Sequence, residues 1–191
     1  MKNSKGGDTP EWCYSGINSS DVIEIFLNPG EYFVGGSDFQ VRTFLGSCVS
    51  ITLWHPRLRF GAMSHYLLSS RPGNVTPGYA LEASCKLDGK YADEVFALMV
   101  RELRDAKVPV TECQAKIFGG GNMFPNRPVP DQLDIGLKNG QAAKYLLVAY
   151  GIPIVSEHLF GIGHREIIFN LGNGDVWVRQ AKPDFLVAMP D

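Results

Sequence analysis

The chain has 191 residues, 45% of them hydrophobic, and a formal net charge of −2 at pH 7. This length and composition suit one globular domain with a hydrophobic core and leave little room for a second one. The small negative charge lacks the basic footprint of a nucleic-acid binder. No apolar run is long enough to span a membrane, and residues 1–8 lack the apolar stretch of a secretory signal. We therefore expect a cytoplasmic protein without membrane insertion.

The first part of the chain predicts a tail followed by short strands. Residues 1–20 are rich in glycine and serine, which predicts a flexible tail ahead of a folded domain over residues 21–191. The apolar segment 22–27 predicts a short strand, because an Asn-Pro-Gly turn signal follows it directly. Residues 31–34 predict a further strand after this turn.

Two stronger strands are predicted from alternating side chains in segments 48–54 and 59–68. The dipeptide His55-Pro56 ends the first of these strands, and we expect His55 to be exposed in the turn. A hairpin that joins the two strands is the simplest topology, since consecutive strands are usually neighbours in space.

The second half of the chain alternates helices with strands. Apolar residues at helical spacing predict helices over 91–106 and 141–150, with Asn139 as the cap of the second helix. Strands are expected at 114–118 and 153–156, and a hairpin at 164–171 and 175–179. These elements predict a single α+β domain.

Cys48 and His65 are the candidate nucleophile and base. The small-residue turn Gly46-Ser47 gives a substrate carbonyl room to approach Cys48, and it frees backbone N–H groups for a developing oxyanion. In a hairpin, Cys48 would reach His65, and the imidazole would lower the pKa of the thiol and favour the thiolate. Alternatively, Cys48 is a buried strand residue and His65 a core histidine, which spacing alone favours.

Metal and cofactor sites are not expected. There is no CxxC pair, and His158 and His164 would need a third ligand that no motif supplies. Glycines 119–121 follow a strand but match no phosphate-binding motif, so we expect them to allow close backbone packing beside the active site. Three further cysteines have no neighbouring base in sequence and are expected to be structural. They are Cys13, Cys85 and Cys113.

Several segments together carry a family resemblance. The first two are T-F-L-G-S-C-V-S-I-T-L-W at 43–54 and F-G-A-M-S-H-Y-L-L at 60–68. The others are K-Y-A-D at 90–93, A-K-I-F-G-G-G-N-M-F at 115–124, Ile135-Gly136 with Asn139, and G-H-R at 163–165. In this order the segments resemble the CheD family of chemoreceptor glutamine deamidases, and they extend over most of the chain.

The resemblance implies sheets layered against two helices and a cytoplasmic enzyme that needs no cofactor. Its expected reaction is hydrolysis of glutamine side chains on methyl-accepting chemotaxis receptors, through a thioester between substrate and enzyme. The family nucleophile falls on Cys48 and the family histidine on His65. A threonine is the expected third member, and we assign it to Thr43. The family register points instead to the preceding position, which is occupied by Arg42.

Other functions remain open at this point. The family is also known to bind CheC-type phosphatases that act on phosphorylated CheY, so the chain could serve as a binding module for such a partner. The presence of both Cys48 and His65 argues against a purely non-catalytic role. The same chemistry could also hydrolyse glutamate methyl esters or transfer glutamine to amines. Met123 and Phe124 are a candidate partner contact if exposed, and the plainer interpretation is that they belong to the core.

Overall fold

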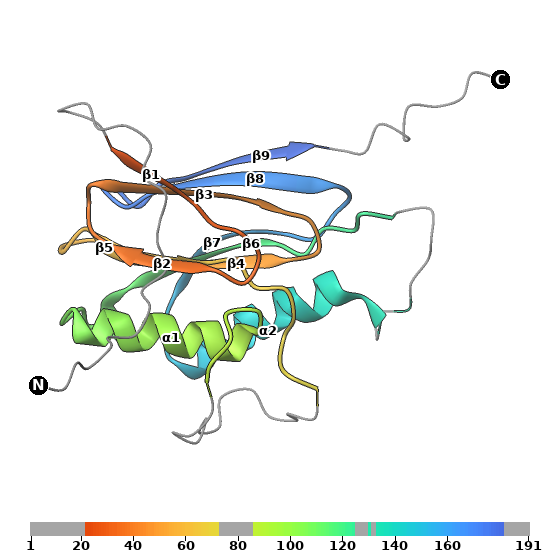
Figure 1. The fold of residues 1–191 in the computed structure, drawn as a ribbon, viewed down its shortest axis with the longest axis horizontal. Helices are drawn as coiled ribbons and strands as arrows, with labels where there is room; N and C mark the ends of the chain where they lie inside the picture. The colour runs from red at the N-terminus through yellow and green to blue at the C-terminus, as the bar shows by residue number, and fades with distance from the viewer. Residues whose placement is uncertain (1–21, 73–85, 125–129, 131–132, 182–191) are drawn as a thin grey trace, which may run out of the picture.

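The structure is a computed structural model that describes residues 22–72, 86–124, 130 and 133–181. The predicted tail at residues 1–20 lies outside the described residues, as do Cys13 and Cys85. Within the described part of the chain, nine β-strands and two α-helices form a single α+β domain (Figure 1). The predicted fold class is therefore confirmed.

The secondary structure follows the chain in this order. The strands are β1 (Ile23–Phe26), β2 (Tyr32–Gly35), β3 (Phe39–Leu45), β4 (Val49–His55), β5 (Phe60–Ser64), β6 (Gln114–Gly119), β7 (Ile154–Leu159), β8 (His164–Asn170) and β9 (Val176–Ala181). The helices are α1 (Ala92–Asp105), α2 (Ile135–Ala149) and a short 3-10 helix at Val110–Glu112. Neither α-helix in the described residues is long and apolar enough to cross a membrane.

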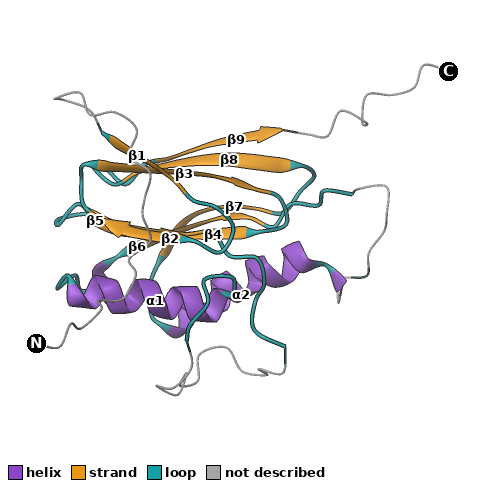
Figure 2. Cartoon of the chain, in the orientation of Figure 1, coloured by secondary structure: helices purple, strands orange, loops and turns teal. Residues whose placement is uncertain are grey.

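The domain has three layers (Figures 1 and 2). The first sheet has the strand order β1-β3-β8-β9, and the second has the order β2-β5-β4-β6-β7. The two sheets pack face to face, and both helices cover the outer face of the second sheet. The second sheet is therefore buried on both of its faces.

Side chains of the second sheet alternate between two hydrophobic cores. Along β5, Ala62 joins the core beneath the helices, whereas Met63 joins the core between the sheets. Ile51 of β4 packs on the helix side, and the first sheet contributes Val41 and Ile167 to the core between the sheets. Burial on both faces explains why β5 is an almost continuous apolar sequence, whereas β4 alternates apolar residues with Ser50 and Thr52.

The predicted hairpins are confirmed. Strands β4 and β5 pair antiparallel, with Thr52 opposite Met63 and His55 opposite Phe60. Strands β8 and β9 also pair antiparallel, around the turn at 172–174. The expectation that His55 is exposed was wrong, because only 1% of the residue is exposed. The turn after β4 folds back over the imidazole, and the backbone N–H of Leu58 donates to its Nδ1 at 3.2 Å.

The second helix begins earlier than predicted. It begins at Ile135, and Asp134 is its N-cap, with a side-chain oxygen that accepts a hydrogen bond from the backbone N–H of Leu137 at 3.0 Å. Asn139 lies inside the helix, so its prediction as a cap was wrong. Gly136 and Gly140 weaken the helical signal in this first part of α2.

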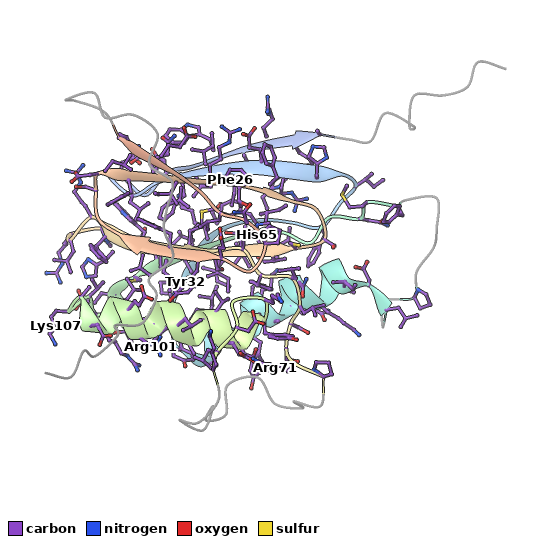
Figure 3. All side chains as sticks on the ribbon, in the orientation of Figure 1. Phe26, Tyr32, His65, Arg71, Arg101 and Lys107 are labelled. Atoms are coloured by element: carbon purple, nitrogen blue, oxygen red, sulfur yellow. The ribbon has the colours of Figure 1, made fainter. Side chains whose placement is uncertain are left out.

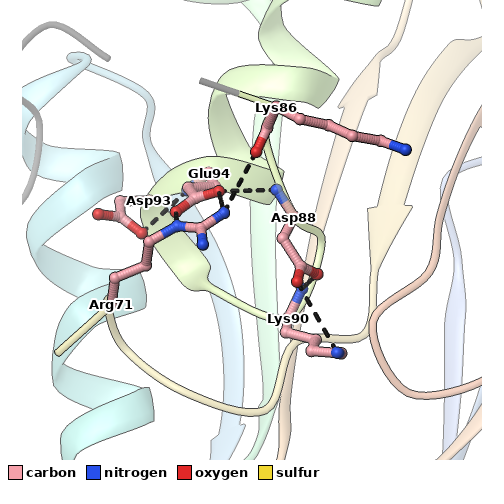
Figure 4. A network of polar contacts seen from close by, with 6 residues as sticks. All are labelled: Arg71, Lys86, Asp88, Lys90, Asp93 and Glu94. Carbon is pink, nitrogen blue, oxygen red and sulfur yellow. Dashed lines mark hydrogen bonds and ion pairs between the residues drawn. The ribbon is translucent and has the colours of Figure 1, made fainter. Parts of the chain in front are cut away.

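A buried carboxylate connects α1 to the segment that follows β5 (Figure 4). The Glu94 side chain is fully buried, and it accepts hydrogen bonds from the Arg71 guanidinium and, at 2.7 Å, from the backbone N–H of Asp88. Arg71 also donates to the carbonyl of Lys86 at 3.2 Å. These contacts fix residues 71 and 86–88 on the N-terminal end of α1.

Candidate active site

Cys48 lies in the short loop 46–48 between β3 and β4, so the nucleophile candidate sits where the chain passes from one sheet to the other. Its side chain is partly buried and packs against the core between the sheets. Burial raises the pKa of the Cys48 thiol above its ordinary value. The resting side chain is therefore a neutral thiol at pH 7.

The glycine run 119–121 holds this loop through backbone hydrogen bonds. The backbone N–H of Gly121 donates to the Gly46 carbonyl, and that of Gly120 donates to the Cys48 carbonyl, each at 2.8 Å. Gly119 has a φ of 121°, and a Cβ atom there would collide with the carbonyl oxygen of Cys48. The prediction that these glycines allow close backbone packing beside Cys48 is confirmed.

The third loop carbonyl belongs to Ser47, and it accepts a hydrogen bond from the Asn139 side chain at 3.2 Å. All three carbonyls of loop 46–48 are therefore bound. In contrast, among the described residues the backbone N–H groups of this loop donate no backbone hydrogen bond to another residue, and that of Cys48 interacts with its own sulfur. In a trans peptide the C=O of one residue and the N–H of the next point in opposite directions, so the N–H groups of Ser47 and Cys48 point away from Gly121 and Asn139, which bind the preceding carbonyls. Free N–H groups next to a cysteine can bind an oxyanion.

His65 lies between the two sheets, where only 3% of it is exposed (Figure 3). The pairing of β4 with β5 continues through a bridge between Val49 and Tyr66. This register places Ser50 opposite His65, and Cys48 diagonally across from it on the same face of the sheet. Diagonal neighbours have backbones roughly 7–8 Å apart and can touch through their side chains. Within the described residues no hydrogen bond joins the Cys48 thiol to the imidazole.

Thr43 contacts the histidine ring directly. Its Oγ1 lies 2.7 Å from the Nδ1 of His65 and donates a hydrogen bond to the Leu27 carbonyl, also at 2.7 Å. A hydroxyl has one proton, so the oxygen that donates to Leu27 must accept from His65. The neutral ring therefore carries its proton on Nδ1, and its Nε2 keeps a lone pair that can take a proton.

Arg42 occupies the opposite face of β3. Its guanidinium pairs with Glu166 at 2.8 Å and with Glu24 at 3.5 Å, and it stacks on the ring of Phe44. Alternation along the strand explains the difference, because neighbouring residues point to opposite faces. Thr43, and not Arg42, is the residue that contacts His65.

The electrostatics of His65 favour a neutral ring. Burial lowers its pKa to about 4, against smaller opposing effects from the Leu27 carbonyl and the charge of Glu31. Together with the raised pKa of Cys48, this shift overturns the expectation that the imidazole creates a resting thiolate. The arrangement instead suits a general base that takes the thiol proton when the sulfur attacks.

A pocket of about 210 Å³ opens beside the loop, and its lining includes Ser47, Met123, Phe124 and Ile135. Phe124 is 67% exposed, so its interpretation as a core residue was wrong. Met123 is partly buried and packs on the loop, because a Cβ at Gly46 would lie 3.1 Å from its sulfur. The two residues thus form part of an apolar wall next to the loop.

Sequence reasoning missed the role of Arg165. This fully buried side chain donates hydrogen bonds to the carbonyls of Gly119, His158 and Phe160, and burial lowers its pKa. It therefore fixes the strand ends that carry the glycine run. The only sequence signal was its place in the family segment at 163–165. Among the described residues, no group of three or more His, Cys, Asp or Glu side chains is placed to hold a metal ion.

Comparisons with known proteins agree with the sequence resemblance. The family model of CheD, described as chemotactic sensory transduction, matches residues 78–180. A protein of Albidiferax ferrireducens named "Probable chemoreceptor glutamine deamidase CheD 2" is 53% identical over 161 residues, which cover 84% of this chain and 89% of the relative. A CheD 3 protein of Dechloromonas aromatica with the same description is 43% identical over 161 residues, covering 83% of this chain and 88% of the relative. This chain therefore belongs to the CheD family.

Proposed function

We propose that this protein is a glutamine deamidase that hydrolyses glutamine side chains on methyl-accepting chemotaxis receptors. The names of its relatives supply the substrate class. The observation that carries the mechanism is the 2.7 Å contact between Thr43 and Nδ1 of His65, because it leaves Nε2 as the ring nitrogen that can take a proton. His65 and Cys48 share one face of the sheet. We expect the reaction to take place in the cytoplasm, on the cytoplasmic region of the receptors.

The first half of the reaction forms a thioester. As the Cys48 sulfur attacks the amide carbon of the glutamine side chain, the thiol proton moves to Nε2 of His65. The free N–H groups around Gly46, Ser47 and Cys48 hold the resulting oxyanion. The intermediate then collapses: the C–N bond breaks, and the imidazolium gives its proton to the departing ammonia.

The second half releases the product. Neutral His65 takes a proton from a water molecule, whose oxygen attacks the thioester carbon. The C–S bond breaks, the proton returns to the Cys48 sulfur, and the glutamine has become glutamate. The low pKa of His65 keeps the resting ring neutral, and it favours the return of the proton from the imidazolium to the leaving group. No cofactor takes part in this scheme.

The apolar wall beside the loop is our candidate for protein contact. Phe124 is exposed and lines the pocket, and Met123 packs against the loop that carries Cys48. We propose that this wall contacts the receptor segment next to the target glutamine. A CheC-type phosphatase is the candidate second partner for the same residues.

The test is incubation of the purified protein with cytoplasmic fragments of a receptor. We expect release of ammonia and conversion of specific glutamines to glutamate, detected by mass spectrometry of receptor peptides. A methylated receptor fragment in parallel tests ester hydrolysis through release of methanol. If methanol but no ammonia is released, the protein is a methylesterase and not a deamidase. If neither product is released, a binding module is the better function.

A further inference from the structure

Asn139 connects the two segments that carry the proposed nucleophile and base. It lies on α2, on the far side of the second sheet from His65, and is fully buried. Its Nδ2 donates to the Leu67 carbonyl at 2.7 Å and to the Ser47 carbonyl at 3.2 Å. Ser47 directly precedes Cys48, and Leu67 closely follows His65. One side-chain amide therefore bridges both segments.

The orientation of this amide follows from its partners. Both are carbonyl oxygens, which can only accept, so the NH₂ group must face them. The Asn139 Oδ1 then points away, and it is buried without a hydrogen-bond partner among the described residues. An unpaired buried acceptor costs stability, so the hydrogen bonds to Ser47 and Leu67 must offset that cost. The two donated hydrogen bonds are therefore the feature of Asn139 that needs an explanation.

The Ser47–Cys48 peptide supplies that explanation. The described backbone contains no cis peptide bonds, so the Ser47 carbonyl and the Cys48 N–H point in opposite directions. By binding the carbonyl from the side of α2, Asn139 turns the Cys48 N–H away from the helix, towards the side of the sheet where the thiol packs. A hydrogen bond to the carbonyl also polarises the peptide and strengthens its N–H as a donor.

We propose that Asn139 is a positioning residue that aims the Cys48 N–H at the oxyanion of the reaction. This inference rests on the proposed function, since it assigns a part in the same chemistry. The position of Asn139 is itself fixed, because its backbone carbonyl accepts a hydrogen bond from the Tyr66 hydroxyl at 2.7 Å. Tyr66 in turn pairs with Val49 through two backbone hydrogen bonds of 3.0 and 3.1 Å.

The experiment compares two reactions of Cys48 in the full chain. Acylation by p-nitrophenyl acetate passes through an oxyanion, whereas alkylation by iodoacetamide displaces iodide and forms none. Both rates are measured by mass spectrometry of the peptide that contains Cys48. In Asn139→Leu, which keeps a similar volume without donors, we expect the ratio of acylation to alkylation to fall roughly tenfold to a hundredfold.

Three variants keep the inference falsifiable. Asn139→Ala also removes both donors and should lower the ratio in the same way, which covers the case in which Asn139→Leu does not fold. Tyr66→Phe should give a smaller loss in the same direction. Leu146→Ala removes buried side-chain volume from the same helix away from the loop, and it should leave the ratio unchanged.

The outcomes separate this inference from the proposed function. If both reactions slow equally in the Asn139 variants, or neither slows, Asn139 has only a structural role and the inference is overturned. If the ratio falls as expected while the wild-type protein releases no ammonia from receptor fragments, the inference stands and the deamidase proposal fails. Neither reagent depends on a receptor, so the ratio can be read in both cases.

Discussion

The two ends of the β4–β5 hairpin carry similar residue types in different surroundings. At one end Cys48 lies diagonally across from His65, and at the other Trp54 pairs with Gln114, so that His55 and Cys113 flank the last pair of β4 and β6. Both histidines are buried, with 3% of His65 and 1% of His55 exposed. Residue type and burial alone therefore do not separate a candidate active site from an ordinary turn.

The hydrogen bonds of the two rings do separate them. Nδ1 of His55 accepts from the backbone N–H of Leu58, so its proton lies on Nε2, which faces Glu112 at 3.5 Å. Nδ1 of His65 donates to Thr43, so its Nε2 keeps the lone pair. The ring of His55 holds the turn through Nδ1 and carries its proton on Nε2, which has no hydrogen-bond partner among the described residues, whereas Nε2 of His65 keeps a lone pair that can take a proton.

The two cysteines differ in access and in their neighbouring backbone. Cys113 is fully buried, its thiol lies 3.9 Å from the Pro109 carbonyl, and burial together with Glu112 raises its pKa to about 11. Cys48 is partly exposed, and the backbone N–H groups of its loop donate no backbone hydrogen bond to another described residue. The comparison teaches that the candidate active site differs from the other end of the hairpin by three features found together: a ring nitrogen that can take a proton, an accessible sulfur and free backbone N–H donors.

Substitution of the two cysteines should give the largest contrast. Cys48→Ala removes the atom that bonds to the substrate, so ammonia release from receptor fragments should fall by several orders of magnitude. Cys113→Ala should keep normal turnover and lower the free energy of unfolding by roughly 1–2 kcal/mol, because it leaves a small cavity. Turnover assays and urea unfolding measure both. Near-normal turnover in Cys48→Ala would end the proposed mechanism.

The two histidines should show a similar but smaller contrast. His65→Ala removes the proposed base, and kcat should fall roughly 10²- to 10⁴-fold. His55→Ala opens the turn after β4 and should reduce stability while kcat stays within a few-fold of wild type. Steady-state kinetics on receptor fragments with both variants provide the comparison. Equal losses of kcat would show that the tautomer difference between the rings has no catalytic meaning.

Thr43 and its neighbour on the strand allow a narrower test. Thr43→Val keeps the shape of the side chain but removes the acceptor for His65, so kcat/KM should fall roughly ten- to a thousandfold. Thr43→Ser restores the hydroxyl and should recover most of the loss. Arg42→Ala changes only the outer face of the first sheet and should leave kcat/KM near wild type. A larger loss in Arg42→Ala than in Thr43→Val would reverse the assignment.

Labelling with a limiting amount of iodoacetamide should modify Cys48 roughly tenfold or more faster than Cys113, because Cys48 is partly exposed and Cys113 is buried. The raised pKa of Cys48 means that its labelling rate should still be rising above pH 8, unlike that of a cysteine in a resting ion pair. Peptide mapping after timed labelling provides both rates. Faster modification of Cys113 would contradict the contrast in access.

The sequence predicted most elements but not all of them. Strand β3 was missed because Phe44 faces outward and Thr43 inward, which blurs the apolar alternation expected of a half-buried strand. The start of α2 was missed because glycine disfavours helices. A Cβ at Gly140 would lie 2.6 Å from the ring of Phe160, so packing explains why that glycine is needed.

Family motifs and the pairing of neighbouring strands predicted only part of the site. Cys48, His65 and Thr43 lie close enough in sequence for a hairpin model and a family signature to propose them together. Asn139 and Arg165 could not be assigned in this way, because each acts on a loop far away in the sequence through side-chain hydrogen bonds to carbonyls. Carbonyl acceptors exist at every residue, so no residue type marks the partner in the sequence.

The last and smallest effect concerns stability against pH, and it separates the two buried histidines once more. The folded protein holds the pKa of His65 near 4, below its ordinary value of 6.5. Between these values the unfolded chain binds more protons at this position than the folded one, so stability rises with pH. Above pH 6.5 His65 causes no loss of stability; as pH falls from 6.5 towards 4 the loss grows, and it reaches about 3 kcal/mol near pH 4. Urea unfolding of wild type and His65→Gln at pH 7.5, 5.5 and 4.5 measures this loss of stability.

The His65→Gln variant should lose less stability than wild type on acidification. The His55→Gln variant retains His65 and should keep the part of the pH dependence that comes from His65. Parallel curves for wild type and His65→Gln would show that the ring is protonated as easily in the folded protein as in the unfolded chain, and would remove the argument for a neutral resting base.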